Sequence, residues 1–238
     1  MRRVLRTFAY ACLGGLIATV AWSAFTWATW PDVGRLATEW PDTTAFMRLH
    51  EERRAADPSL PALRHRWARD AEISLHVRRA FVSAEDMEFF HHDGFSTSEL
   101  EVALREALRG ERFRGASTIT QQLAKNLWLS PSRNPMRKVR EALLTRSLEK
   151  HLTKRRILEL YVNVVELGPG LYGVAAASER YFGLPAVALG EREAAMLAAS
   201  LPRPSTWHPG VASRAYAAYV DDIIARMARA EFLWRLVD

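Results

Sequence analysis

The sequence predicts a mostly α-helical protein with one transmembrane helix at its N-terminus. Apolar residues recur at helical spacing along most of the chain, and no alternating strand pattern with a hairpin turn occurs in it. An uncharged run of 25 residues, Thr7–Pro31, is long enough for a membrane span, since a helix needs about 20 apolar residues to cross the hydrocarbon core. The 238 residues are 49% hydrophobic and 25% charged, which excludes a disordered or collagen-like chain.

The N-terminal segment is expected to be an uncleaved signal anchor. Arg2, Arg3 and Arg6 precede the uncharged run, so the positive-inside rule places residues 1–6 in the cytoplasm and the rest of the chain outside it. A cleavable signal peptide is the alternative, but its apolar stretch is usually about 7–15 residues long. The single cysteine, Cys12, excludes a disulfide framework and a cysteine-based zinc cluster.

The remaining chain divides into helical segments. Residues 32–69 contain prolines around one helical pattern, Thr43–Ala56, and we expect a stalk and a first helix there. Further helical patterns run from Ile73 to Phe89 and over residues 98–109, 136–152, 153–165 (with Thr153 as N-cap), 189–201 and 212–237.

The net charge of +6 is distributed unevenly. Residues 32–104 hold 9 basic and 14 acidic side chains, a net −5, whereas residues 105–156 hold 14 basic and 4 acidic side chains, a net +10. A concentrated cationic segment predicts an anionic partner. A nucleic acid is excluded because the segment is expected outside the cytoplasm. A phosphate on a lipid headgroup or on a diphosphate substrate fits better.

An acidic and aromatic cluster at residues 84–95 is the first candidate for chemistry. Glu85, Phe89 and His92 are spaced to share one face of a helix that Gly94 ends. Burial beside aromatic rings raises the pKa of a carboxyl toward use as a general acid or base, although the pattern alone also fits a solvated acidic face. The cluster holds a single Glu-x-x-His pair where a di-iron bundle needs two, so no metal site is predicted.

Two polar clusters follow within the cationic segment. Ser117, Gln121 and Lys125 are spaced to share one helical stripe, and a stripe of hydroxyl, amide and ammonium groups suits a polyol or a phosphate. A capped, solvated helix start is the alternative. Four cations at residues 133–140 come next, and Glu141 is placed to orient them. The remaining motifs are a buried stripe at Ile157, Leu158 and Tyr161 and a proline-fixed turn at residues 201–209.

In chain order, these five segments resemble the five motifs of the peptidoglycan glycosyltransferase family, whose domain also forms the N-terminal part of class A penicillin-binding proteins. The resemblance covers residues 70–210, and one anchor without a transpeptidase domain makes the chain similar to the monofunctional members. In the fifth motif, His208 stands where the family commonly has Asn. The matching residues are Glu85, Asp86, Phe89, His92 and Gly94; Gly115 and Ser117 to Gln122; Arg137, Lys138 and Glu141; Ile157, Leu158, Tyr161 and Asn163; and Pro204 and Ser205.

The resemblance implies a lysozyme-like glycosyltransferase domain at residues 70–210, with residues 211–238 packed on it as a C-terminal helix. It implies that lipid II, a disaccharide-pentapeptide on undecaprenyl diphosphate, is polymerised into β-1,4 glycan strands, with inversion at the donor anomeric carbon and release of the lipid diphosphate. Glu85 is then the general base, and Glu141 is the second catalytic carboxylate, which organises the donor site. Substrate-binding roles fall to Asp86, Ser117, Thr118, Gln121, Gln122, Lys125, Asn126, Arg133, Arg137 and Lys138, with Lys125 and Arg133 on the diphosphate.

No cofactor is required, although the resemblance leaves a divalent metal, Mg or Mn, open. The expected partners are lipid II, the growing glycan chain and the lipid bilayer, with proteins of the division or elongation machinery as candidates. The catalytic domain is expected in the periplasm, tethered to the bacterial inner membrane. Four apolar residues flanking the cationic clusters are expected to dip into the bilayer: Phe113, Leu127, Trp128 and Leu129.

Two rival functions use the same residues differently. A hydrolase or lytic transglycosylase also builds a helical, lysozyme-like domain around one Glu, but it has no need of a phosphate-binding segment. A non-catalytic membrane scaffold leaves the clusters around Glu85 and Gln122 without a purpose. A glycosyltransferase is therefore the interpretation that uses all of the motifs.

Overall fold

The protein forms two units in the computed structural model, Met1–Val33 and Gly34–Asp238. In the first unit, the described residues are helical as far as Ala28. Among the described residues, no helix is both long enough and apolar enough to cross a membrane. The structure describes residues 28–96, 117–132, 134–230 and 234–237, together with positions 10, 13–15, 17, 20–22 and 24.

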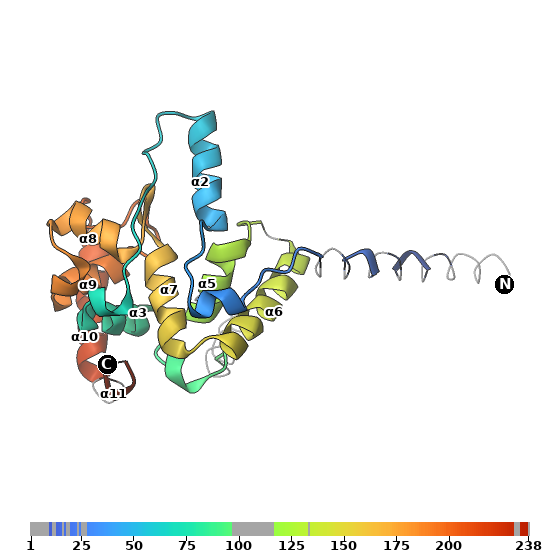
Figure 1. Cartoon of the computed structure of the whole chain (residues 1–238). Coiled ribbons are helices and arrows are strands. Elements are labelled where there is room, and N and C mark those ends of the chain that lie inside the picture. The colour runs from blue at the N-terminus through green and yellow to red at the C-terminus, as the bar shows by residue number, and fades with distance from the viewer. Residues whose placement is uncertain are drawn as a thin grey trace, which may run out of the picture. The chain divides into compact units, whose positions relative to one another are not determined.

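The second unit is mostly helical, as the sequence predicts. Its helices are α2 (Ala45–Ala56), α3 (Leu75–Glu85), α5 (Ile119–Trp128), α6 (Pro135–His151), α7 (Lys154–Val164), α8 (Val174–Phe182), α9 (Glu191–Ala198), α10 (Arg214–Arg229) and α11 (Trp234–Val237), with 3-10 helices at Gly34–Ala37, Asp70–Glu72, Phe89–His91 and Ala186–Ala188. In Figure 1, α7 lies between two groups of helices. Helices α5 and α6 are on one side, and α3, α8, α9 and α10 are on the other.

Threonine side chains cap the starts of α7 and α2. The side chain of Thr153 accepts a hydrogen bond from the N–H of Arg156 at the start of α7, which confirms the predicted N-cap. Thr44 caps α2 in the same way by accepting from the N–H of Met47. The helices expected at residues 43–56, 136–152, 153–165 and 189–201 are confirmed, whereas the one expected at 98–109 lies outside the described residues.

The first motif does not continue the helix that precedes it. α3 ends at Glu85, and the following residues form a loop and a 3-10 turn. The prediction that Glu85, Phe89 and His92 share one helix face is therefore wrong. The reason lies at Asp86, whose backbone leaves helical geometry (φ −165°, ψ 81°) and whose carboxylate accepts a hydrogen bond from the N–H of Ile119, 33 residues away.

A small three-stranded sheet accompanies the helices, although the sequence shows no alternating strand pattern. β1 (Arg64–His65) pairs in parallel with β3 (Leu171–Tyr172), and β2 (Glu166–Gly168) pairs antiparallel with β3. Strands of two or three residues are too short for an alternating pattern to show. The turn between β2 and β3 contains Gly170 at a φ of +68°, a left-handed conformation that glycine adopts without strain.

Two further elements differ from the sequence prediction. α8 is absent from the predicted helices because glycines stand at both of its ends, so no side-chain cap marks its start. In the closing segment, predicted as one helix, α10 ends at Arg229 with Ala230 as its C-cap, and α11 begins at Trp234. α10 packs against α3 and α9, and α11 packs against α3.

Within the second unit, residues 34–44 contact α7 through Arg156. The Arg156 guanidinium donates to the backbone carbonyls of Leu36 and Glu39, each at 2.7 Å, and lies 4.3 Å from the ring centroid of Trp40. Trp40 in turn stacks on Trp67 at 4.7 Å. This part of the expected stalk is therefore attached to the same unit as the site.

The core that positions the site lies where α5 packs against α7 and α3 packs against α9. Phe81 of α3, Leu123 of α5 and Leu160 of α7 are fully buried. Burying such a side chain contributes about 1.5–3 kcal/mol. The core therefore holds the C-terminal end of α3 and the first turns of α5 in fixed positions, and these two places carry the first two motifs.

Candidate active site

The carboxylate of Glu85, at the last position of α3, is the centre of the candidate site. The side-chain amide nitrogen of Gln122, on α5, donates to it at 2.6 Å and also donates to the carbonyl of Ser117 at 3.2 Å. The hydroxyl of Tyr161, on α7, donates to the Gln122 amide oxygen at 2.9 Å. Burial raises the pKa of Tyr161 well above its ordinary value, so the hydroxyl keeps its proton and the amide must present its NH₂ group to Glu85.

The surroundings of Glu85 favour a proton acceptor. Burial raises the pKa of Glu85 above its ordinary value, and the hydrogen bond from Gln122 and the charge of Lys125 oppose this effect in part. α10 contributes as well, because the charge of Arg226 lowers the pKa of Glu85. The pKa of Tyr219, also on α10, is raised mainly by burial and next by the charge of Glu85, so Tyr219 lies near the carboxylate. A carboxylate whose pKa is closer to neutral takes up a proton more readily than an ordinary one, which suits a general base.

Lys125 links this base to a cluster of charged side chains on α6. Burial lowers the pKa of the Lys125 ammonium, and the charges of Glu141 and Glu85 act in the opposite direction. Glu141, on α6, is only 3% exposed; its oxygens accept from Arg137 at 2.7 Å and from Lys138. A buried carboxylate with two cationic donors is held in one orientation, and it holds the cations in place in turn.

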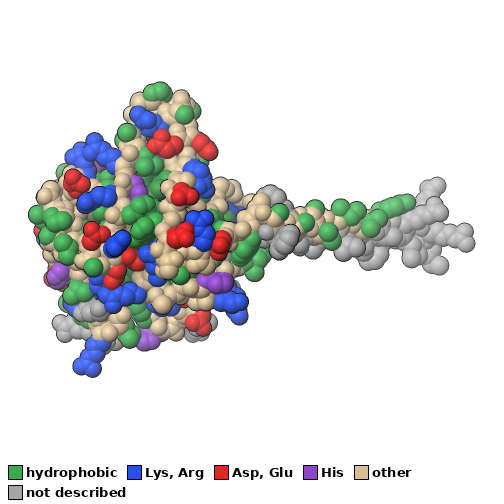
Figure 2. Space-filling model, viewed as in Figure 1, with side chains coloured by type: hydrophobic (Ala, Val, Ile, Leu, Met, Phe, Trp, Pro, Cys, Tyr) green, Lys and Arg blue, Asp and Glu red, His purple; other side chains and the backbone are tan. Residues whose placement is uncertain are grey.

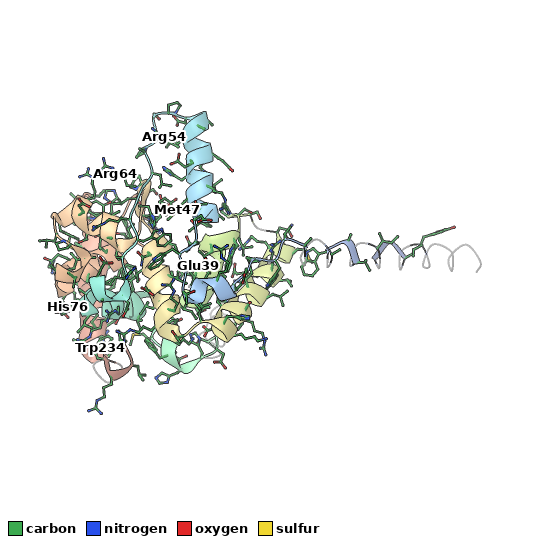
Figure 3. The ribbon with its side chains drawn as sticks, in the orientation of Figure 1. Glu39, Met47, Arg54, Arg64, His76 and Trp234 are labelled. Atoms are coloured by element: carbon green, nitrogen blue, oxygen red, sulfur yellow. The ribbon has the colours of Figure 1, made fainter. Side chains whose placement is uncertain are left out.

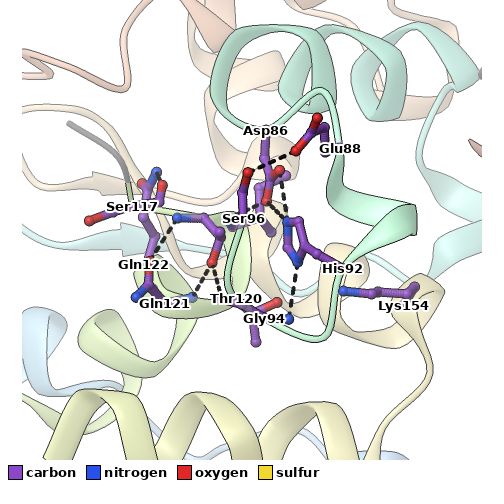
Figure 4. A network of polar contacts seen from close by, with 12 residues as sticks. Asp86, Glu88, His92, Gly94, Ser96, Ser117, Thr120, Gln121, Gln122 and Lys154 are labelled. Carbon is purple, nitrogen blue, oxygen red and sulfur yellow. Dashed lines mark hydrogen bonds and ion pairs between the residues drawn. The ribbon is translucent and has the colours of Figure 1, made fainter. Parts of the chain in front are cut away.

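Asp86 anchors the first motif to the start of α5 (Figure 4). Its buried carboxylate accepts from the N–H of Ile119 at 3.0 Å and from Nε2 of His92 at 3.0 Å. His92 Nδ1 accepts from the N–H of Gly94 at 3.0 Å, so Nε2 is the nitrogen that donates to Asp86. The position of a negative charge at a helix N-terminus is itself favourable.

The second motif begins α5 with a capping box. Thr118 Oγ1 accepts from the N–H of Gln121 at 3.2 Å, and Oε1 of Gln121 accepts from the N–H of Thr118 at 3.0 Å. Asn126 donates to the carbonyl of Gln122 at 2.8 Å. The predicted helical stripe is wrong for Ser117, which precedes the helix. Gln121 and Lys125 do lie four residues apart in α5.

The predicted site residues therefore fall into three groups. Glu85, Gln122 and Lys125 come together with the Glu141 cluster, whereas the side chains of four others bond mainly within the protein. Arg133 lies outside the described residues, as does Phe113 of the expected bilayer contact. The four that bond within the protein are Asp86, Thr118, Gln121 and Asn126.

Sequence reasoning missed three side chains of this site. Tyr161 was expected only to fill the core, yet its hydroxyl orients Gln122. Tyr219 and Arg226 belong to α10, far along the chain from the motifs. The signal that points to them is their seven-residue spacing, which places both on one face of the last long helix.

The expected bilayer contact at the end of α5 is wrong for two of its residues. Leu127 and Leu129 are 1% and 4% exposed and belong to the core. Leu127 follows the buried Leu123 by four residues and thus shares its inward face. Trp128 is partly buried.

The donor set does not fit a metal site. Among the described residues, no three His, Cys, Asp or Glu side chains converge as metal ligands would. The Glu141 oxygens are taken by Arg137 and Lys138, and both nitrogens of His92 bond within the first motif. No step of the chemistry below is therefore assigned to a metal.

Comparison with known proteins agrees with the five motifs. A family model described as transglycosylase matches residues 55–228. The chain belongs to the transglycosylase family. The family inferred from the motifs is thus confirmed, and so is the prediction of an enzyme. All of the predicted site residues lie within the matched range.

Several relatives share most of their length with this chain. It is 43% identical over 232 residues to the biosynthetic peptidoglycan transglycosylase of Azoarcus sp. (strain BH72), with 97% of this chain and 99% of that one covered. A protein of the same name from Aromatoleum aromaticum is 46% identical over 192 residues, covering 80% of this chain and 83% of its own. A third, from Nitrosomonas eutropha, is 43% identical over 165 residues, covering 69% and 68%.

Proposed function

We propose that this transglycosylase family member is a peptidoglycan glycosyltransferase that polymerises lipid II. The observation that carries the proposal is the carboxylate of Glu85, whose pKa is raised by burial and which lies within electrostatic reach of Lys125. Lys125 in turn lies within electrostatic reach of Glu141 and its two cations. A base next to cations is what transfer from a diphosphate donor requires. The names of the relatives support peptidoglycan as the product.

In the proposed reaction, Glu85 accepts the proton of the 4-hydroxyl group of the acceptor GlcNAc. The hydroxyl oxygen attacks the anomeric carbon of the donor chain, and the new C–O bond forms with inversion from α to β. The bond to the lipid diphosphate breaks, and the electron pair leaves with the diphosphate. Lys125 and Arg133 stabilise the charge that accumulates there, and such pre-placed charges act without reorganising.

The other site residues support this chemistry in different ways. Arg137 and Lys138 hold Glu141 at the donor side. Gln122 and Ser117 keep the base in position. Four other side chains are hydrogen-bonded within the protein, so their role is to fix the shape of the loop and helix start that face the substrate. They are Asp86, Thr118, Gln121 and Asn126.

The N-terminal segment is the proposed membrane anchor, with residues 1–6 in the cytoplasm and the catalytic unit in the periplasm of a bacterium. An uncharged run over residues 7–31 behind three arginines supports this topology. The described apolar side chains at Leu13, Ile17 and Val20 are exposed, which suits contact with lipid. Proteins of the division or elongation machinery are candidate partners at the same membrane.

A hydrolase of glycan strands is the second candidate function, and one experiment separates the two. Purified full-length protein is incubated with lipid II in detergent and, separately, with cell-wall sacculi. The proposal predicts lipid-linked β-1,4 polymer from lipid II and no soluble fragments from sacculi. Solubilised fragments together with unconsumed lipid II would establish the hydrolase instead.

A further inference from the structure

A surface pocket lies apart from the catalytic residues around Glu85. Its volume is about 510 Å³, within the size range of ligand sites, and four separate chain segments meet around it. One of these segments is β1, where Arg64 projects outward in Figure 3. Six lining residues are Pro61, Arg64, Pro169, Arg180, Tyr181 and His208.

The walls of this pocket are fixed by close packing. Tyr181 donates to the carbonyl of Leu167 at 3.2 Å, and a Cβ at Gly168 would lie 2.0 Å from its hydroxyl oxygen. A Cβ at Gly170 would lie 2.8 Å from His50. Glycine at both positions therefore allows the β2–β3 turn to lie against Tyr181 and His50. The His208 ring stacks on Tyr181 at 5.6 Å with an angle of 17° between the ring planes.

The polar groups of the pocket are hydrogen-bond donors. Burial and the charge of Arg180 lower the pKa of His208, so its ring is neutral, and its Nδ1 accepts from the N–H of Gly210 at 3.2 Å. The remaining ring proton is therefore on Nε2. In the part of the chain that the structure describes, Arg64 and Arg180 have no ion-pair partner, and both also line an adjoining pocket with Arg66 and a single acid, Glu179.

An apolar wall lies beside these donors. Pro61, Pro169 and Leu171 contribute it. Figure 2 shows basic side chains on the part of the surface where Figure 3 labels Arg64. A guanidinium binds a carboxylate through two parallel hydrogen bonds. A bare inorganic anion would leave this apolar wall without a partner. A ligand that fits the pocket therefore carries aliphatic groups next to its negative charge.

We propose that this pocket binds a free carboxylate of a short aliphatic peptide, with Arg64 and Arg180 as the anion contacts. Under the proposed function, on which this identification of the ligand rests, the peptide is the one attached to the disaccharide of the substrate or of the glycan product. The pocket is then a second contact for the peptide-bearing glycan, separate from the groups that catalyse transfer.

The test is equilibrium binding to the full-length protein in detergent. The probe is a lipid-free disaccharide carrying its peptide, compared with the same molecule after amidation of its carboxyl groups. Arg64→Gln with Arg180→Gln is expected to weaken binding of the acidic probe about tenfold or more, because hydrogen bonds to charged groups are lost. Arg146→Gln, an exposed substitution on α6, serves as the matched control and is expected to bind as the wild type does.

Unchanged binding by the double variant would overturn the proposal. Equal binding of the amidated probe, or equally strong binding of inorganic phosphate at the same pocket, would also overturn it. Lys125→Gln locates the probe, since loss of binding in this variant would place it in the catalytic cluster instead. Lipid II turnover is measured separately. Turnover without peptide binding rejects only this site, and peptide binding without turnover rejects only the proposed function.

Discussion

Glu85 is oriented by a chain of two neutral side chains. Tyr161 donates to Gln122, and Gln122 donates to Glu85. If the Gln122 amide turned over, its oxygen would face the carboxylate and favour the protonated acid. The Tyr161 hydroxyl prevents this, so a residue that fills the core also helps to keep the base in the form that accepts a proton.

Tyr161→Phe removes this hydroxyl and keeps the ring. We expect the acid limb of the pH profile of kcat/KM to move to higher pH, because Gln122 no longer presents its NH₂ group reliably and the pKa of Glu85 rises. The control is Tyr172→Phe, which makes the same chemical change at another buried tyrosine. The hydroxyl of Tyr172 donates to the backbone carbonyl of Phe46 at 3.4 Å. Identical pH profiles for the two variants would show that Tyr161 has only a packing role.

The raised pKa of Glu85 also predicts a stability effect. A carboxyl whose folded-state pKa lies above its unfolded value of 4.5 binds its proton more tightly when folded, so stability is lost as the pH rises above that value. Glu85→Gln removes the buried charge. We expect the variant to have a higher Tm than the wild type at about pH 8 and an equal Tm at about pH 4, where the carboxyl is protonated in both states.

Thermal unfolding at both pH values measures this difference. Glu51→Gln, on the exposed surface of α2, controls for the substitution itself and is expected to show no such pH dependence. A wild type that is the more stable protein at about pH 8 would mean that the charge of Glu85 is compensated in the folded state.

At the scale of the elements, α5 organises the site. One face supplies Gln122 and Lys125, its first turn receives Asp86, and its opposite face is buried against α6 and α7. The position of α7 therefore matters to the site, and the start of α8 lies close to the last turn of α7. There, Gly173 has a φ of +77°, and a Cβ on it would lie 2.4 Å from the carbonyl oxygen of Asn163.

Gly173→Ala tests this close approach. The backbone strain and the clash together are expected to lower the free energy of unfolding by more than about 3 kcal/mol. Gly183→Ala is the matched control, because Gly183 also has a positive φ but a Cβ added there would meet no atom within 4 Å. Its expected cost is about 1–2 kcal/mol, from backbone strain alone. Equal losses in denaturant titrations would mean that the contact with Asn163 relaxes easily.

At the scale of the whole molecule, local sequence patterns predict most of the helices but not the contacts between them. Helical spacing and the Thr153 cap predict α7, and the resemblance to the family implies that Glu85, Lys125 and Glu141 share one site. The end of α3 depends on a bond from Asp86 to a residue 33 positions away, which no local pattern contains. The same holds for Tyr219, which reaches the site only because α10 packs on α3 and α9.

The proposed topology also concerns the whole molecule. In a Cys12→Ser background, Arg2→Cys and Arg229→Cys place single thiols near the two ends of the chain. We expect a membrane-impermeant maleimide to label the thiol at position 229 in intact spheroplasts, and the one at position 2 only after lysis. Labelling of both positions, or of neither, before lysis would contradict a single span with a cytoplasmic N-terminus.

Single-turnover polymerisation of lipid II by Glu85→Gln tests the central claim most directly. Loss of a general base costs about 10²–10⁴-fold in rate, so we expect near-abolition of glycan synthesis while lipid II binding is retained. Glu88→Gln, three residues away and exposed, is expected to keep its turnover. Wild-type turnover by Glu85→Gln would contradict the account, because the acceptor proton would then have to leave by another group.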